Sequence, residues 1–477
     1  MKTKIIYFLL IVMIGLLGCE KESTFYKAIS RIELPSNIVY VDSIVRFKNH
    51  SDSVNVTYKW NFGDGTISDK RLVNHIYRNY GNYTVSLITY VDNIPTDTST
   101  VNIKVMIGEK YFDMKKLTDG IDFVECSDSS ILLIGATRDN DSDQESKMFL
   151  SKLDKNLRNK WTKYLDSKLN PAIGSIERLS DGNFILSGSF NNTNNNGYFA
   201  LSKIDSSGNV LWDYKYSQAK GYCRYATESK DGGIVAIGKE GYLHTSSGNT
   251  VQIVSVMKTD ANGKFEWKRQ FVDDWLMEAA NIVSVDDGFI FASSTRGVNN
   301  IILNDLDSLV ITKIGFDNHT IWKKSKEWQI SYSYIYNVFS SYIGLNNNKL
   351  VAVNDGNGFV MVFDLQGNFI KRNQLGDGNG KNRFIATTKD NGFIIGGGAT
   401  YWDGIALTGF DNSGIEKWSK SYGTRDTRCW PSYGFGSKVK PLQDGNLLFL
   451  GSSYKPCSDF FRSSMLLFKT NGNGEIQ

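Results

Sequence analysis

The sequence predicts an all-β protein in two parts, a small β-sandwich followed by a seven-bladed β-propeller. Aromatic residues make up 13% of the 477 residues, with 44 glycines but only 6 prolines, a composition that suits short strands joined by tight turns. Short runs in residues 28–106 alternate apolar and polar side chains, and residues 107–477 repeat one longer pattern. The chain is too long for one ordinary domain.

The N-terminus predicts a signal peptide, residues 1–18, followed by a lipidated cysteine. Two lysines precede an apolar run at residues 5–17, which fits a signal-peptide core better than a membrane span. The run ends in Leu16-Leu17-Gly18-Cys19, which resembles the lipobox of bacterial lipoproteins. The resemblance implies acyl chains on Cys19, and each buried methylene adds about 0.8 kcal/mol to anchoring. An ordinary secretory signal with an incidental cysteine is the alternative.

Residues 19–27 are expected to form a polar tether to the membrane. Glu20-Lys21-Glu22 loosely resembles the surface-export signals of Bacteroidetes-type lipoproteins, so we expect a cell-envelope protein in the outer membrane, facing the surface. The net charge of +4 gives no argument for nucleic-acid binding. No later apolar run is long enough for a second membrane segment.

Residues 28–106 read as a β-sandwich. The expected strands lie at residues 32–34, 43–47, 56–60 and 83–87, each with apolar side chains on one face. Trp60-Asn61-Phe62-Gly63-Asp64-Gly65-Thr66, residues 73–77 and residues 81–87 together resemble a PKD domain. The resemblance implies an immunoglobulin-like sandwich that serves as a spacer or protein-contact module. We expect His75 to be a structural hydrogen-bonding residue and Asp64 to cap its own turn, with calcium binding by Asp64 as the alternative.

Residues 107–477 contain seven diverged repeats of about 45–60 residues, which predict propeller blades of about four short strands each. Each repeat begins with a polar turn and continues with an apolar strand. The turns are Asp128-Ser129-Ser130, Asp181-Gly182, Asp231-Gly232-Gly233, Asp287-Gly288, Asn346-Asn347-Asn348, Asp390-Asn391-Gly392 and Asp444-Gly445. The fifth copy is the most diverged, because it lacks the tryptophan found in most of the others.

A second turn in most repeats places an Asp seven residues before a Trp, as in Asp205, Gly208 and Trp212. The motif resembles the blade motif of quinoprotein-type propellers, one residue shorter. We expect the Asp to cap the turn and the Trp to pack between blades. The last repeat ends where its outer strand should begin, so a strand at residues 111–114 is expected to complete it and close the ring.

Catalytic and metal-binding motifs are sparse. Only four histidines occur, none beside another, and the sequence lacks metalloprotease, nucleophile-elbow and phosphate-loop motifs. Cofactor binding is not expected, apart from a candidate calcium site in one acidic run, for which a solvated loop is the alternative. The run contains Asp139, Asp141, Asp143 and Glu145.

One aromatic stretch is the candidate ligand-binding segment, because arginine and aromatic side chains can stack on sugars or anchor a partner. It contains Arg428, Trp430, Tyr433 and Phe435, and core packing is the alternative. The flanking Cys429 could form a disulfide with Cys457, or both could be separate buried thiols. Cys126 and Cys223 are expected to be small buried residues.

These features favour a binding protein over an enzyme. The expected partners are an envelope protein or a glycan, held by the loops on one propeller face, and the membrane through the lipid on Cys19. A carbohydrate-active enzyme, either a lyase or a glycoside hydrolase, and a structural subunit of an envelope assembly are the alternatives. Carboxylates with raised pKa values that converge in a deep central pocket would favour the enzyme, whereas a broad aromatic patch would favour binding.

Overall fold

The structure is a computed structural model, and it divides the chain into two compact units, Met1–Met106 and Ile107–Gln477. It describes residues 28–50, 56–108, 110–112, 117–138, 147–165, 169–191, 197–216, 221–244, 250–271, 276–279, 281–295, 308–327, 341–346, 348–354, 359–374, 381–398, 405–422, 438–455 and 462–477. Across these ranges every regular element is a β-strand, and none contains a helix that could span a membrane.

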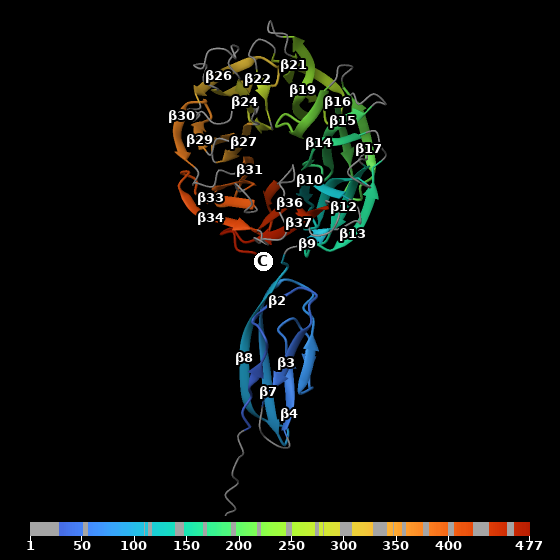
Figure 1. The fold of residues 1–477 in the computed structure, drawn as a ribbon, viewed down its shortest axis with the longest axis vertical. Coiled ribbons are helices and arrows are strands. Elements are labelled where there is room, and N and C mark those ends of the chain that lie inside the picture. Colours follow the sequence, from blue (N-terminus) through green and yellow to red (C-terminus); the bar gives the residue numbers. More distant parts are fainter. Residues whose placement is uncertain are drawn as a thin grey trace, which may run out of the picture. The chain divides into compact units, whose positions relative to one another are not determined.

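The first unit is a sandwich of two sheets (Figure 1). One sheet has the order β1 (Ile32–Glu33), β3 (Val45–Asn49), β6 (Leu72–His75). The other has the order β2 (Ile38–Tyr40), β8 (Ile94–Met106), β7 (Gly81–Val91), β4 (Val56–Asn61), β5 (Ile67–Ser68). Trp60 and Phe62 both point into the sandwich, since their side chains are 0% and 1% exposed and stack on one another.

The expected structural roles of His75 and Asp64 are also confirmed. Nε2 of His75 lies 2.8 Å from one carboxylate oxygen of Asp64. The other oxygen accepts hydrogen bonds from the backbone N–H and the hydroxyl of Thr66. The His75 ring stacks on Phe62 with 4.2 Å between centroids. Asp64 therefore uses both oxygens to hold its turn and the histidine in place.

The second unit is a β-propeller in which the described residues form seven sheets around an axis (Figure 1). Each sheet is an antiparallel meander of four strands, and β22 and β23 together provide the first strand of the fourth sheet. The first to third sheets consist of β10 (Leu117–Glu125), β11 (Ile131–Arg138), β12 (Lys147–Leu153) and β13 (Asn159–Tyr164); β14 (Leu169–Arg178), β15 (Phe184–Asn191), β16 (Gly197–Ile204) and β17 (Val210–Lys215); and β18 (Gly221–Glu228), β19 (Ile234–His244), β20 (Thr250–Thr259) and β21 (Phe265–Gln270). The fourth and fifth consist of β22 (Leu276–Glu278), β23 (Ile282–Val285), β24 (Gly288–Thr295), β25 (Ser308–Ile314) and β26 (Thr320–Glu327); and β27 (Ser341–Asn346), β28 (Lys349–Asn354), β29 (Phe359–Asp364) and β30 (Phe369–Gln374). The sixth and seventh consist of β31 (Lys381–Thr387), β32 (Phe393–Gly398), β33 (Ile405–Phe410) and β34 (Glu416–Tyr422); and β35 (Lys438–Pro441), β36 (Leu447–Lys455), β37 (Arg462–Thr470) and β9 (Lys110–Phe112).

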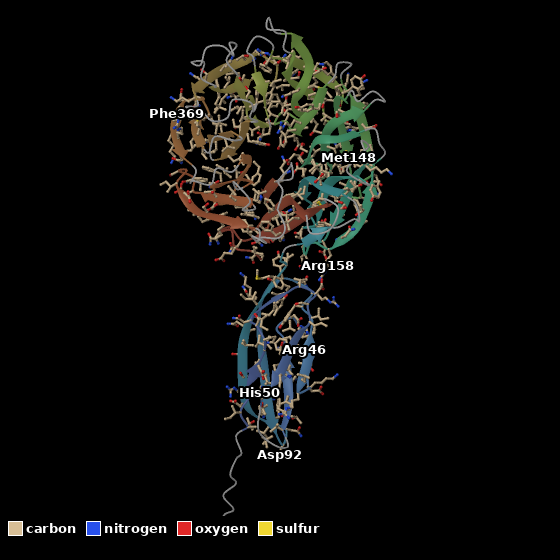
Figure 2. The ribbon with its side chains drawn as sticks, viewed as in Figure 1. Arg46, His50, Asp92, Met148, Arg158 and Phe369 are labelled. Atoms are coloured by element: carbon tan, nitrogen blue, oxygen red, sulfur yellow. The ribbon has the colours of Figure 1, made fainter. Side chains whose placement is uncertain are left out.

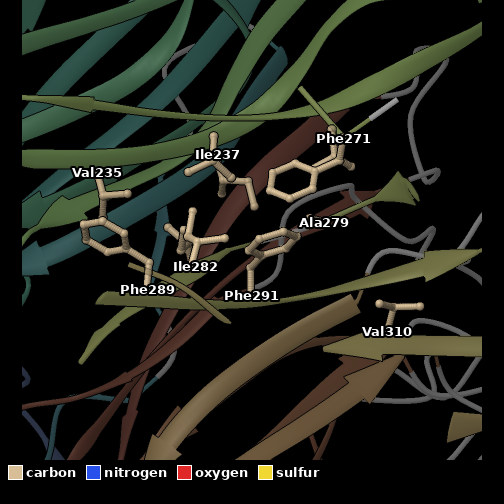
Figure 3. Packing of buried hydrophobic residues seen from close by; sticks show 11 residues of the cluster. Val235, Ile237, Phe271, Ala279, Ile282, Phe289, Phe291 and Val310 are labelled. Atoms are coloured by element: carbon tan, nitrogen blue, oxygen red, sulfur yellow. The ribbon is translucent and has the colours of Figure 1, made fainter. Parts of the chain in front are cut away.

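Neighbouring sheets pack face to face through apolar side chains from their middle strands. Figure 3 shows the cluster between the third and fourth sheets, where Val235 and Ile237 of β19 meet Phe289 and Phe291 of β24. Burial of each such side chain stabilises the fold by about 1.5–3 kcal/mol. Because every sheet is buried on both faces by its neighbours, the middle strands are apolar on both sides.

The turn after the third strand is held by its first residue, as predicted. In the first sheet Asp154 accepts hydrogen bonds from the backbone N–H groups of Asn156 and Arg158. Figure 2 labels Arg158 at the outer rim of the propeller. Asp205, Asp260, Asp364 and Asp411 accept the same pair of bonds, and Asn471 does so in the last sheet.

A lysine two residues before this turn pairs with the Asp of the turn between the first two strands. The Nζ–carboxylate distances are 3.6 Å for Lys152–Asp128, 2.7 Å for Lys203–Asp181, 3.2 Å for Lys258–Asp231, 2.7 Å for Lys313–Asp287 and 3.4 Å for Lys469–Asp444. The lysine side chains are 3–13% exposed, so each ammonium group needs its partner. These pairs connect the two turns on one propeller face.

Each outer-strand tryptophan packs against the turn of the next sheet, which confirms the predicted contact between blades. A Cβ atom on Gly208 would lie 2.9 Å from Trp161, and one on Gly263 would lie 3.0 Å from Trp212. Both glycines have positive φ angles, +79° and +80°, so the turn requires glycine for its backbone and for the close approach. The indole N–H of Trp418 donates to the carbonyl of Gly472 in the last sheet.

The predicted closing strand is confirmed for Tyr111 and Phe112. They lie in β9, which pairs with β37 and is the outer strand of the last sheet. Residues 113 and 114 of the predicted strand lie outside the described ranges. The closing strand thus comes from the start of the unit and the rest of its sheet from the end.

Candidate functional site

The first strands of the sheets surround the propeller axis, and their free edges need hydrogen-bonding partners. Each of these strands is paired on one side only, with the second strand of its own sheet. Backbone groups on the other side would be left unsatisfied in a buried setting. Side chains from the neighbouring sheet satisfy several of them.

One position supplies these side chains, six residues before the Asp of the first turn. Its oxygen accepts a hydrogen bond from a backbone N–H of the next sheet's first strand. The donor–acceptor pairs are Ile176–Asp122 at 3.1 Å, Ala226–Ser175 at 3.3 Å and Ile343–Asn281 at 2.9 Å. The repeat thus links the first strands of neighbouring sheets at these three junctions around the axis.

The Asp122 member of this set differs from the Asn281 member in one respect. Asn281 also donates its amide N–H to the carbonyl of Ile343, at 2.7 Å. A carboxylate cannot donate, and at this place Lys440 of β35 donates instead to the carbonyl of Ile176, at 3.1 Å. Asp122 and Lys440 together therefore perform the function that Asn281 performs alone.

Lys440 also lies between two carboxylates. Its Nζ is 3.1 Å from Asp122 and 2.8 Å from Glu177. The side chain of Asp122 is fully buried, whereas those of Lys440 and Glu177 are 23% and 22% exposed. Burial opposes the lysine charge, but the attraction of the two carboxylates outweighs it and raises the pKa of Lys440 above its ordinary value. The cluster joins the seventh, first and second sheets.

The third and fifth sheets contribute an arginine and two tyrosines to the same region. A β-bulge between Cys223 and Tyr225 changes the register at Arg224, and bulges of this kind redirect a side chain. Nη2 of Arg224 donates to the hydroxyl of Tyr342 at 3.3 Å, and the guanidinium lies 5.9 Å from the Tyr342 ring centroid. Burial and the negative charges of Glu177 and Asp122 keep the pKa of Tyr225 well above its ordinary value.

The charged groups of this cluster are paired with one another. Asp122 and Glu177 do converge near the axis, but both carboxylates are engaged by Lys440. Tyr225 is neutral at ordinary pH, and its raised pKa keeps it neutral in more alkaline solution as well. Arg224, Tyr225 and Tyr342 are only partly buried, and these residue types dominate the energetics of many interfaces.

The candidate residues chosen from the sequence all lie outside the described ranges. They are Cys19; Asp139, Asp141, Asp143 and Glu145; Arg428, Trp430, Tyr433 and Phe435; and the pair Cys429 and Cys457. Where the structure does describe the chain, no group of three or more metal-ligand side chains is assembled. Cys126 and Cys223 are buried free thiols, as expected.

The axial cluster is what sequence reasoning missed. Alignment of the repeats on their first turn could have found part of it, because Asp122, Ser175 and Asn281 occupy one register position. Lys440 carries a weaker signal, a lysine on a short strand that begins the last repeat. The bulge at Arg224 has no sequence signal.

One comparison with known proteins concerns the first unit. Residues 36–105 match the family model of the PKD domain. No curated protein matches the chain.

Three solved structures show the range of structural likeness. A quinonprotein alcohol dehydrogenase-like protein from Bacteroides thetaiotaomicron is 10% identical, with a TM-score of 0.41 over 84% of this chain and 96% of that one. The β-propeller domain of the trilobed protease from Pyrococcus furiosus is 11% identical, with a TM-score of 0.43 over 76% and 97%. A protein of unknown function from Dyadobacter fermentans is 13% identical, with a TM-score of 0.44 over 65% and 96%. The first unit of this chain is a PKD domain, and its second unit is a β-propeller by its own sheet order.

Proposed function

We propose that this protein is a cell-envelope lipoprotein whose propeller binds a protein or glycan ligand. Acyl chains on Cys19 hold it in the outer membrane, facing the surface, and the PKD domain is the spacer or contact module between anchor and propeller. The lipobox-like sequence before Cys19 supports the anchor. The proposed partners are an envelope protein or a glycan, and the membrane through the lipid.

The observation that carries the binding role is the set of partly buried side chains around the axis. Arg224 and Tyr342 come from two different sheets and meet through a hydrogen bond and a cation–π contact, and Tyr225 follows Arg224 in β18. Glu177 and Lys440 add charged groups beside them. Planar aromatic and guanidinium groups of this kind recognise sugar rings and peptide side chains alike.

Binding can be tested on the full chain carrying Cys19→Ser, which removes the proposed acylation site. The protein is screened against a glycan array and against envelope extracts, and each ligand retained is titrated with two further variants. We expect Arg224→Ala to weaken binding at least tenfold and Tyr342→Phe to weaken it less, because only the hydroxyl is lost. Lys264→Ala, on an exposed turn, is the matched control and should leave affinity unchanged.

Two outcomes would contradict the proposal. One is retention of every ligand with equal affinity by Arg224→Ala and wild type, which would move the site away from the axis. The other is incorporation of labelled palmitate into the Cys19→Ser variant at the wild-type level, which would remove the anchor from Cys19. Each outcome bears on a different half of the proposal.

A further inference from the structure

The outer strand of the last propeller sheet consists of two separate pieces of chain. β9 pairs with β37 at three positions, from Lys110 opposite Leu467 to Phe112 opposite Met465. Three residues after Leu467 in β37, Thr470 forms a bridge with Ile476. The last residues of the sequence therefore begin an outer strand that β9 continues.

The two pieces are fastened to each other by backbone hydrogen bonds. The carbonyl oxygen of Gln477 accepts from the N–H groups of Ile107 at 2.6 Å and Gly108 at 3.0 Å. Gly108 has a φ of 69°, a left-handed conformation that glycine adopts without steric cost, and consecutive N–H groups around such a residue can point to one acceptor. The Ile107 side chain is 1% exposed, which holds this junction in the propeller.

The chain passes from the first unit to the second at this same junction. The PKD domain ends with β8 at Met106, and the propeller begins at Ile107. Any pull on residues 1–106 therefore enters the propeller at Ile107 and acts first on the split strand. A tethered protein that holds a ligand experiences such a pull between its anchor and its ligand.

We propose that the split outer strand is a tension-responsive latch, in which residues 107–112 detach from β37 and from Gln477 before either unit unfolds. This inference rests on the proposed function for the origin of the force. The pairing of β9 is shorter than that of the other outer strands: β17 forms five residue pairs with β16, against three here. A tight turn also connects β16 to β17, whereas no turn connects β37 to β9.

Single-molecule force spectroscopy tests the latch without ligand or lipid. One handle is attached at the N-terminus of the full chain carrying Cys19→Ser, and the other at Ser206 in an exposed propeller turn. Release of residues 107–112 should lengthen the chain by about 21 Å, at roughly 3.5 Å per residue. Unfolding of residues 28–106 would lengthen it by roughly 270 Å on the same scale. We expect the small step first, and a large step with no small step before it would overturn the proposal.

A disulfide lock provides the matched control. Tyr111 lies opposite Leu466 in the ladder, so Tyr111→Cys with Leu466→Cys can join β9 to β37. The oxidised double variant should lose the small step, the reduced one should show it, and Leu466→Cys alone should show it in both states. A small step that persists in the oxidised double variant overturns the latch. Loss of the latch leaves the binding proposal intact, and failure of the binding screen leaves the force measurement valid.

Discussion

Substitution of Lys440 by methionine should destabilise the propeller strongly, because it leaves a fully buried carboxylate without its cation. Nζ of Lys440 lies 3.1 Å from Asp122 and 2.8 Å from Glu177, and it also donates to the carbonyl of Ile176. Removal of one partner of a buried ion pair costs about 3–5 kcal/mol. Glu177 is 22% exposed and can recover some hydration, so we expect about 3 kcal/mol.

The expected change in melting temperature follows from the size of the unit. The propeller has about 370 residues, and unfolding entropies near 2.1 cal/mol/K per residue give roughly 0.8 kcal/mol/K for the whole unit. A loss of about 3 kcal/mol then lowers Tm by about 4 °C. Differential scanning calorimetry measures it, and the PKD transition in the same scan is an internal control that Lys440→Met should not shift.

A second substitution tests whether the loss arises from the hydrogen bonds between neighbouring first strands at the axis. Asp122→Asn in the Lys440→Met background restores an amide that can accept from Ile176 N–H and donate to its carbonyl, as Asn281 does for Ile343. We expect the double variant to recover about 2 kcal/mol of the loss, as a positive coupling energy. Unchanged Tm in Lys440→Met would refute the argument. Strict additivity of the two substitutions would refute the equivalence with Asn281.

The pH dependence of this effect has a defined sign. The pKa of Lys440 is raised in the folded state above its ordinary value of 10.5. Its contribution to stability is therefore complete below the unfolded pKa and is lost only as pH rises through the folded pKa. The loss in free energy of unfolding that Lys440→Met causes through this lysine should stay constant from pH 6 to pH 9. It should shrink only in more alkaline solution.

Two further predictions concern a propeller turn and the PKD domain. Gly208→Ala should lower the free energy of unfolding by about 2–4 kcal/mol, because the residue has a positive φ of +79° and a Cβ there would lie 2.9 Å from Trp161. Gly182 has a similar φ, and a Cβ there would have nothing within 4 Å, so Gly182→Ala is the control and should cost about 1 kcal/mol. Equal losses in chemical denaturation would show that the contact with the tryptophan is irrelevant. Partial burial opposes the charge of Asp64, but its hydrogen bonds prevail and lower its pKa below 3.8. Its contribution to stability is therefore present above pH 4 and is lost as pH falls through the folded pKa. Asp64→Asn should reduce the dependence of the melting temperature of the PKD domain on acidic pH, and an unchanged dependence would contradict the assignment.

The fold could be predicted because its determinants are local and repeated. The turn residues Asp205, Gly208 and Trp212 lie within eight residues, and the same capped turn recurs in other blades. Ring closure by β9 could be predicted because the last repeat lacks an outer strand and the unit begins with an unused one. The lysines paired with turn aspartates, such as Lys203 with Asp181, also repeat, and that signal was overlooked.

The axial cluster could not be predicted in the same way, because ring closure brings it together. Lys440 is 318 residues from Asp122 and 263 from Glu177 in the chain. No local sequence pattern indicates that the first strands of the seventh, first and second sheets are neighbours, because only closure of the ring brings the three together. Arg224 meets Tyr342 across 118 residues, and the bulge that directs it is a property of strand pairing rather than of residue type.

The axial side chains divide into two groups, and this division makes the binding proposal testable. Asp122, Lys440 and Asn281 supply hydrogen bonds that the first strands require, so their substitution should change stability whether or not a ligand is present. Arg224 and Tyr342 contact one another through their side chains, by a hydrogen bond and a cation–π contact. If Arg224 and Tyr342 bind a ligand at the axis, their substitution should weaken binding by more than the accompanying change in melting temperature explains. If affinity instead followed melting temperature across both groups, the axial cluster would be structural throughout, and ligand binding would have to be sought on the loops of the propeller face.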